Sequence, residues 1–183
     1  SSSDGVKIVA TWTRSNGSIP ILQTRYSNDS GASWSSTIDL TSNRVDEHQI
    51  AMSSDGSRVV SVYQTASDGW RIKARASSDG GSSWGTEQDI SAQAIDAYNP
   101  QVVMSSDGTK VFATWDKGTS AHGRYSSDGG LNWYSGADFI KVFGPGDGSW
   151  GSMPQIHGSA DGNNLSVIWV NNTSNNTHVR SSH

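Results

Sequence analysis

An eight-residue pattern recurs three times in this chain and restricts the folds that the chain can adopt. Segments 27–34, 77–84 and 126–133 share the pattern Ser-x-Asp-x-Gly-x-x-Trp, and their tryptophans lie 50 and 49 residues apart. A period of about 40 to 50 residues is typical of proteins that stack copies of one supersecondary unit. We therefore expect the chain to be a row of similar small units.

Three other features recur in step with this pattern. An Asp-Gly pair precedes an apolar run that ends in an aromatic residue, a Gln opens the apolar run before that pair, and an Arg lies just before the eight-residue segment or its expected position. The repeat therefore extends beyond the turn to nearly the whole chain. The positions are Asp4, Asp55, Asp107 and Asp161 for the first feature, Gln49, Gln101 and Gln155 for the second, and Arg25, Arg75, Arg124 and Arg180 for the third.

One period reads as four short antiparallel strands joined by tight turns. The first is the run after the Gln, and the other three are illustrated by segments 110–115, 121–125 and 86–90. Asp-Gly pairs suit the hairpin turns, and β-branched and aromatic residues suit the strands. Four antiparallel strands in about 50 residues form one blade of a β-propeller, in which neighbouring blades bury each other's faces. The sequence thus predicts an all-β fold, a β-propeller of four-stranded blades.

The register of the repeat predicts a single repeat domain over residues 1–183. The domain begins at strand two of one blade and ends at strand three of another, which gives about three and a half blades. An open arc of this kind leaves strand edges and blade faces uncovered. We therefore expect the ring to be completed by another copy of the chain, as a homo-oligomer with a dimer favoured, or by the remainder of a longer chain.

The composition agrees with many short strands and excludes some classes of partner. Only 33% of the residues are hydrophobic, while there are 20 glycines and eight tryptophans. The net charge is −4 with both signs interspersed, so neither nucleic acid nor a membrane is an expected partner. The chain has no cysteine, which excludes a zinc site with thiolate ligands.

The eight-residue segments resemble the Asp-box of sialidases and related propellers, also called the bacterial neuraminidase repeat. In such a turn the Asp carboxylate accepts backbone N–H hydrogen bonds, the Gly supplies a positive φ, and the Trp covers the turn. Equivalent positions in different blades lie far apart around a ring, so we expect a structural role and no metal or acid–base cluster. The structural residues are Ser27, Asp29, Gly31, Trp34, Ser77, Asp79, Gly81, Trp84, Ser126, Asp128, Gly130 and Trp133.

The resemblance also implies that a binding site would lie at the blade ends opposite these turns. Polar and aromatic residues occur together in the corresponding loops, and this mixture suits a glycan, which has hydroxyls at its rim and apolar C–H faces. Trp70 and Trp150 are the two tryptophans that the repeat does not explain. The candidate ligand-binding residues are Arg14, Asp46, His48, Trp70, Asp96, Tyr98 and Trp150.

A sialidase-like active site would need, by the same resemblance, three arginines for the substrate carboxylate, a Tyr activated by a Glu, and an acid–base Asp. Segment 18–20 reads Ser-Ile-Pro where such enzymes have Arg-Ile-Pro, and only two glutamates exist, Glu47 and Glu87. Of the arginines, only Arg14 and Arg44 are expected on the binding face. We therefore expect no catalytic set, no metal and no cofactor.

Two functions follow from these observations, and the sequence favours the first. The first is a non-catalytic β-propeller that acts as a glycan-binding or structural, self-assembling module, extracellular or secreted. The alternative is a fragment or subunit of a sialidase-type glycoside hydrolase. The Asp-box turns by themselves do not distinguish these functions, because a fold does not determine an activity.

Overall fold

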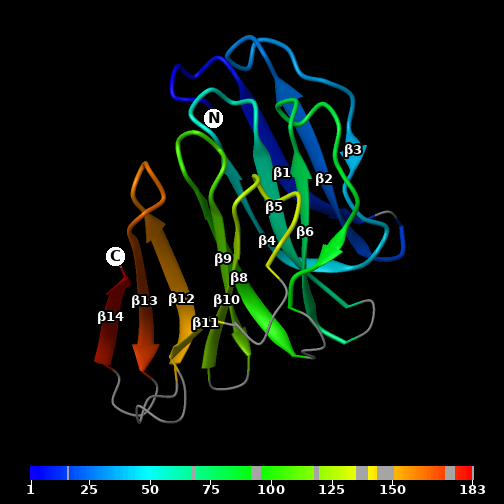
Figure 1. The fold of residues 1–183 in the computed structure, drawn as a ribbon. Coiled ribbons are helices and arrows are strands. Elements are labelled where there is room, and N and C mark those ends of the chain that lie inside the picture. The colour runs from blue at the N-terminus through cyan, green and yellow to red at the C-terminus, as the bar shows by residue number, and fades with distance from the viewer. Residues whose placement is uncertain are drawn as a thin grey trace.

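The computed structural model describes residues 1–15, 17–66, 69–91, 96–117, 120–134, 140–143, 151–171 and 176–182. Within these residues the regular structure is β-strand alone, arranged in four antiparallel sheets that follow one another in chain order (Figure 1). The same residues contain no helix long and apolar enough to cross a membrane.

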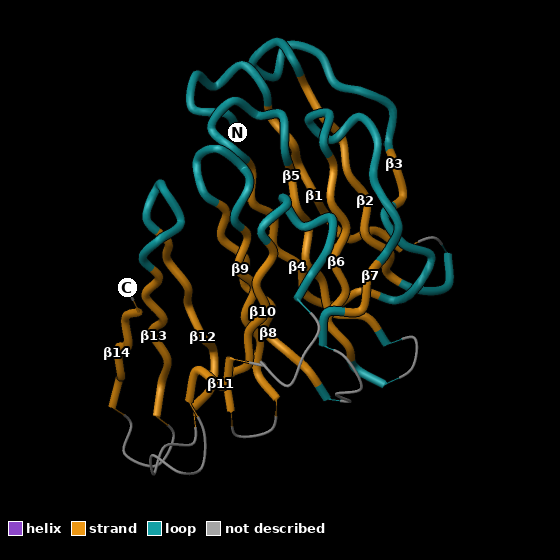
Figure 2. The backbone as a smooth tube through the Cα atoms, in the orientation of Figure 1, coloured by secondary structure: helices purple, strands orange, loops and turns teal. Residues whose placement is uncertain are grey.

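Each sheet is an antiparallel meander of consecutive strands (Figure 2). The first contains β1 (Ile8–Ser15), β2 (Pro20–Ser27) and β3 (Ile38–Asp39), and the second contains β4 (Val45–Met52), β5 (Val59–Thr65), β6 (Arg71–Ser77) and β7 (Gln88–Asp89). The third contains β8 (Ala97–Met104), β9 (Val111–Lys117), β10 (Ser120–Ser126) and β11 (Ile140–Phe143), and the fourth contains β12 (Gly151–Gly158), β13 (Leu165–Asn171) and β14 (Asn176–Ser182). The strand predicted at 86–90 is only two residues long, although Gly85 N–H and Ile90 N–H also bond β6 carbonyls on either side of it.

The Ser-Asp-Gly hairpin turns join neighbouring sheets at one end of the stack. In the turn after β4, the Ser53 hydroxyl donates to Asp55 Oδ1 at 2.6 Å, and Gly56 adopts a φ of 68°. Consecutive turns are then linked by backbone hydrogen bonds, from Ser3 N–H to Ser54 C=O, from Ser54 N–H to Ser106 C=O, and from Ser106 N–H to Ala160 C=O. The four turns therefore form one continuous ladder across the stack.

The three Ser-x-Asp-x-Gly-x-x-Trp turns have nearly the same geometry. In the second, the Ser77 hydroxyl donates to Asp79 at 2.8 Å and accepts from Gly81 N–H at 2.8 Å, while Ser83 N–H donates to Asp79 at 2.8 Å. The Trp84 indole N–H closes the turn by donating to Gly81 C=O at 3.1 Å. The same serine and aspartate bonds occur at Ser27 and Asp29 and at Ser126 and Asp128.

The third turn differs from the other two at its tryptophan. Trp34 Nε1 donates to Gly31 C=O at 3.1 Å, as Trp84 does within its own turn. Trp133 is only 7% exposed and packs into the core between the second and third sheets, and its indole N–H has no hydrogen-bond partner. There the side chain contributes to packing between sheets as well as covering its turn.

The hydrophobic core lies between the faces of neighbouring sheets. Between the second and third sheets, Val60, Val62 and Ile72 pack with Trp115 and Trp133. The other two interfaces are built in the same way, from Leu22, Leu40, Val45 and Tyr63 between the first and second sheets, and from Phe112, Ala121, Ile156 and Val167 between the third and fourth. Because strand residues alternate between faces, each inner sheet contributes to two cores.

Glycines in the turns allow the sheets to approach closely. A methyl group on Gly130 would lie 2.6 Å from Val60 Cγ2, and one on Gly81 would lie 2.9 Å from Val9 Cγ2. Both glycines also have a positive φ, 85° and 91°. Their positions in the repeat are therefore fixed by two constraints, the turn and the neighbouring sheet.

We predict that Gly130→Ala destabilises the protein more than Gly17→Ala. Both variants force alanine into a positive φ, which costs about 1–2 kcal/mol, but the space around Gly17 is open while Val60 lies against Gly130. The clash adds about 1–3 kcal/mol for an overpacked core. Urea unfolding of both variants measures the difference, and equal losses would show that Gly130 is not constrained by the neighbouring sheet.

We also predict that stability falls as the pH drops from about 4 toward 2. Hydrogen bonds from Ser33, Ser53 and Ser105, respectively, are the main cause that lowers the pKa of Asp29, Asp55 and Asp107 from 3.8 to about 2. A lowered pKa stabilises the fold above the unfolded-state value, and this contribution disappears as the folded-state carboxylate is protonated. Circular dichroism during acid titration should show the loss. Asp55→Asn should be less stable than wild type at pH 7 and approach it near pH 2, and a constant difference would contradict this origin.

Candidate functional site

The predicted binding residues within the described part of the chain lie at the end of the strands opposite the Ser-x-Asp turns (Figure 1). Asp46 and His48 lie at the beginning of β4, which runs from this end toward the Ser53 turn. Tyr98 lies at the beginning of β8, and Trp70 directly precedes β6. Since these strands belong to the second and third sheets, the site lies at the junction of two neighbouring sheets.

Arg44, Trp70 and Tyr98 come from separate segments and form a contiguous group. We call this group the aromatic cluster. The Trp70 and Tyr98 ring centroids lie 6.3 Å apart with a tilt of 41°, and Arg44 Cζ lies 5.6 Å from the Trp70 ring centroid. These distances fit an aromatic pair and a cation–π contact. The backbone holds the group together, because Ala97 N–H donates to Trp70 C=O at 2.9 Å.

Tyr98 is the exposed member of the aromatic cluster. Its side chain is 37% exposed, and its hydroxyl lies 3.4 Å from Asp96 Oδ1. Partial desolvation, followed by the nearby Asp96 carboxylate, raises the pKa of Tyr98 above its usual value. The phenol therefore stays neutral at physiological pH and presents a ring face and a hydrogen-bonding hydroxyl to solvent.

A bulge in the first strand of the second, third and fourth sheets shapes the neighbouring surface. The register shifts between Val45 and His48 in β4 and between Tyr98 and Gln101 in β8, and β12 has a shift at the equivalent place. Bulged residues leave the ladder and turn their side chains in new directions. The two bulges line an open groove, which we call the polar groove, formed by Asp46, Glu47, His48, Gln49, Asn99, Pro100 and Gln101.

Asn99 connects the two sides of the polar groove. Its backbone N–H donates to Glu47 Oε2 at 2.8 Å, and its side-chain amide donates to Asp116 Oδ2 at 2.6 Å. Asn99 has a φ of 53°, a conformation that asparagine tolerates better than most residues. Asp116 is only 5% exposed, so the groove is supported from below by a buried carboxylate.

The residues that line the polar groove include two carboxylates and no lysine or arginine. Arg44, at the edge, is held by Asp46 through two hydrogen bonds of 2.9 and 3.3 Å. Its guanidinium is therefore already committed to a carboxylate and to the face of Trp70. This arrangement offers acceptors for hydroxyl groups and little attraction for an anion.

The structure does not bring every predicted residue into this site. Arg14 is exposed near the end of β1 in the first sheet, away from the junction of the second and third sheets. His48 is half-buried in β4 and lines the polar groove, and no group of three or more metal-ligating side chains occurs among the described residues. Trp150 lies outside the described residues.

The candidate ligand-binding residues did not include four residues of the site, namely Arg44, Glu47, Asn99 and Asp116, although Arg44 was expected on the same face. Their signal was the repeat itself, because Glu47 and Asn99 lie two residues before the recurring Gln49 and Gln101. The bulge that projects them from the strand has no residue pattern of its own. Only the pairing of β4 with β5 and of β8 with β9 reveals it.

Among the described residues, a tyrosine and a glutamate are hydrogen-bonded in the core. Tyr63 donates to Glu87 Oε2 at 2.8 Å, is fully buried, and packs with Leu22, Leu40 and Trp84 between the first two sheets. Burial, reinforced by the Glu87 charge, raises the pKa of Tyr63. This phenol is held neutral and away from solvent, which is unsuited to a nucleophile.

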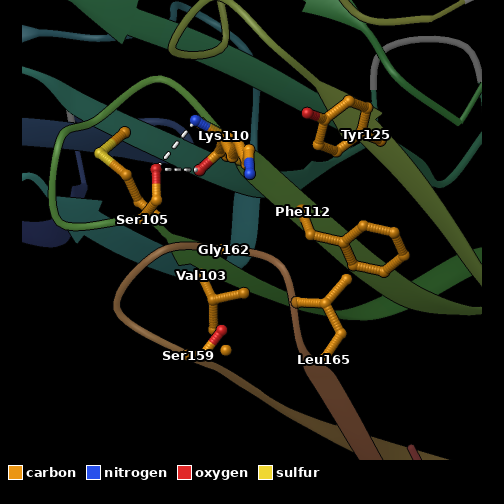
Figure 3. Close-up of a pocket in the computed structure, with 11 residues that line it drawn as sticks. Val103, Ser105, Lys110, Phe112, Tyr125, Ser159, Gly162 and Leu165 are labelled. Atoms are coloured by element: carbon orange, nitrogen blue, oxygen red, sulfur yellow. Dashed lines mark hydrogen bonds between the residues drawn. The ribbon is translucent and has the colours of Figure 1, made fainter. Parts of the chain in front are cut away.

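A second recess lies between the third and fourth sheets (Figure 3). It is lined mainly by apolar side chains, including Val103, Phe112 and Leu165, and its volume of about 10 Å³ corresponds to about one water molecule. Figure 3 shows Lys110 and Ser105 linked by backbone and hydroxyl hydrogen bonds beside it. The recess is a gap in core packing and is too small for an organic ligand.

Solved structures provide the comparison that identifies the fold. A protein of unknown function from Dyadobacter fermentans matches 96% of this chain with a TM-score of 0.62 and 15% identity, and the intramolecular trans-sialidase from Ruminococcus gnavus matches 90% with a TM-score of 0.57 and 17% identity. The leech intramolecular trans-sialidase matches 96% with a TM-score of 0.59 and 15% identity. The fold is sialidase-like.

The sialidase-like comparison concerns the fold alone, because the sequence identities are low. This chain spans 49%, 36% and 29% of the lengths of those three proteins. No family model matches the chain, and no curated protein matches it. The all-β prediction is confirmed, while the propeller ring and the function remain proposals.

We predict that Asn99→Asp destabilises the protein at neutral pH and that acidification relieves part of the loss. The variant places a carboxylate beside Asp116 and removes the amide donor, so two like charges share a partly buried site. Their repulsion raises the folded-state pKa of the pair, and stability returns as one of the two is protonated. Thermal unfolding at pH 7 and pH 5 tests this, and a loss that does not change with pH would contradict it.

Proposed function

We propose that this chain is a non-catalytic, sialidase-like β-propeller module that binds a neutral glycan at the junction of its second and third sheets. The observation that carries the proposal is the contact of Trp70 with Tyr98 directly beside the polar groove. A pyranose ring has apolar C–H faces that stack on aromatic rings and a rim of hydroxyls that require hydrogen-bond partners. Both requirements are met within one surface.

The aromatic cluster supports the stacking part of the proposal. Tyr98 is 37% exposed and Trp70 is half-buried, so one ring is accessible while the other fixes its position. Arg44 also contacts the Trp70 ring, with its Cζ 5.6 Å from the ring centroid. A ring that is already fixed loses little conformational freedom on binding, which favours affinity.

The polar groove supports the choice of a neutral ligand. Asp46 and Glu47 are exposed acceptors for sugar hydroxyls, and Asn99 and Gln101 add amide groups. An acidic sugar would need a cation that is not already paired, and Arg44 is bound to Asp46. Charge in the groove therefore favours an uncharged glycan over a sialylated one.

The repeat supports the propeller part of the proposal. The three Ser-x-Asp-x-Gly-x-x-Trp turns are Asp-boxes in this interpretation, and the four sheets are successive blades of an arc. The aspartate carboxylates accept hydrogen bonds from groups within their own turns, which suits a structural role. The extracellular or secreted location expected for such a module belongs to the same proposal.

Glycan-array binding followed by calorimetry tests the function. We expect neutral oligosaccharides to bind and sialyllactose to bind at least tenfold more weakly. Trp70→Ala and Tyr98→Ala should each lower the affinity at least tenfold, since an aromatic contact of this kind contributes about 1–3 kcal/mol.

Tyr134→Ala is the matched control, because Tyr134 is 63% exposed and stacks on Tyr125 at the opposite end of the stack. It should leave glycan affinity unchanged. Binding confined to sialylated glycans, or turnover of a fluorogenic sialoside, would overturn the proposal and favour the hydrolase alternative.

A further inference from the structure

The first sheet has a face that repeats a covered face of the later sheets. Ala10, Trp12, Arg25 and Trp34 line an open groove on this surface, which we call the leading face. Val9, next to Ala10 on β1, contacts the Gly81 turn of the second sheet, so Ala10 points away from that sheet. The leading face is therefore on the outer side of the stack.

Most equivalents of these residues in the second and third sheets are buried against the preceding sheet, although Arg75 and Trp84 are half-buried. Trp12 corresponds to Tyr63 and Trp115, which are both 0% exposed, whereas Trp12 is only half-buried. Trp34 is 41% exposed, and its equivalent Trp133 is 7% exposed. The same residue types are thus present on the leading face without the sheet that covers them elsewhere.

The turn glycines give a second, independent indication. Gly81 and Gly130 each lie against a valine of the preceding sheet, but around Gly31 a methyl group would contact only residues of its own sheet, at 3.7 Å or more. In the other series, Gly56, Gly108 and Gly162 lie against the stems of Lys7, Arg58 and Lys110, whereas the space around Gly5 is open. In both series, the space next to the first-sheet glycine is the space that a preceding sheet fills in the later sheets.

The fourth sheet, at the other end of the row of sheets, presents the complementary surface. We call this surface the trailing face, and it is formed by Ser166 and Ile168 of β13. Val167, between them, is 5% exposed and packs toward the third sheet, so its neighbours point outward. Their equivalents in the second sheet, Val60 and Val62, are 0% exposed, while Ser166 and Ile168 are only half-buried. The trailing face thus corresponds to the surface that covers the next sheet inside the stack.

The backbone ladder gives this pairing a direction. In each rung the N–H comes from the earlier turn and the C=O from the later turn, as in Ser3 to Ser54 and Ser106 to Ala160. Within the described residues the ladder therefore begins at Ser3, whose C=O would accept the next rung, and ends at Ala160, whose N–H would donate it. A donor at one end and an acceptor at the other suit head-to-tail contact.

We propose that the trailing face of one copy of this chain binds the leading face of a second copy, head to tail. Ile168 then covers the wall formed by Trp12 and Trp34, and Ala160 N–H donates to Ser3 C=O. The interface continues the series of sheet-on-sheet contacts already present within the chain. The interface is heterologous, because it joins two different faces. An open pair would therefore leave one leading face and one trailing face uncovered, whereas a closed dimer covers all four, and a closed dimer is the expected species.

Sedimentation velocity of the wild-type chain is the first test. A dimer is expected. A folded monomer at every concentration would overturn the proposal, and it would favour coverage of the leading face by flanking sequence of a longer chain. The blocking variants are Ala10→Arg and Ile168→Glu, which place charge on surfaces that are accessible in a single copy. Each variant alone should have at least tenfold weaker closed-dimer formation, with an unchanged circular dichroism spectrum.

Mixing the two variants distinguishes head-to-tail contact from other modes of association. The Ile168→Glu chain keeps an intact leading face and the Ala10→Arg chain an intact trailing face, so the mixture should form a one-to-one complex. Leu131→Arg is the control, because Leu131 is 46% exposed and lies on neither face. It should dimerise as wild type does. Failure of the mixture to associate, or loss of dimer in the control, would contradict the assigned faces.

Discussion

Packing of one sheet face on the next is the interaction on which the whole molecule depends. No sheet here has a core of its own, because the buried residues of each, such as Val62, Tyr63 and Trp115, are covered by side chains of a neighbour. Backbone separation at these interfaces is set by glycines, since Gly81 and Gly130 leave no room for a side chain. Stability in such a row is shared between adjacent units and is not a property of any single unit.

Turn aspartates serve this packing by fixing the backbone. Asp79 accepts bonds from Ser77 and Ser83, which organise the turn so that Gly81 and Trp84 lie at defined positions. Hydrogen bonds of this kind satisfy backbone groups at a surface that has no strand partner. The acidic residues of the repeat are thus explained by local geometry, and the groups available for recognition lie at the other end.

The sequence allowed the fold to be predicted better than the site. Strand order and turn positions follow from spacing and from turn residues such as Gly56 and Gly130, whose conformations are local. From the sequence, Trp70 and Tyr98 could be placed on the same face of the molecule. Their contact could not be predicted, because it depends on how two sheets pack. Asn99 was not singled out among the polar residues of its loop, since the register shift that exposes it is a property of strand pairing and leaves no local residue pattern.

The bulges in β4, β8 and β12 separate the residues of a strand that pack in the core from those that form the outer surface. Residues on either side of each bulge stay in register with the core, while those within it contribute to the open end. Substitution of an exposed bulge residue such as Asp46 can therefore change the outer surface with little effect on the strands beneath. In a chain of similar units, recognition can diversify one unit at a time while the scaffold is preserved.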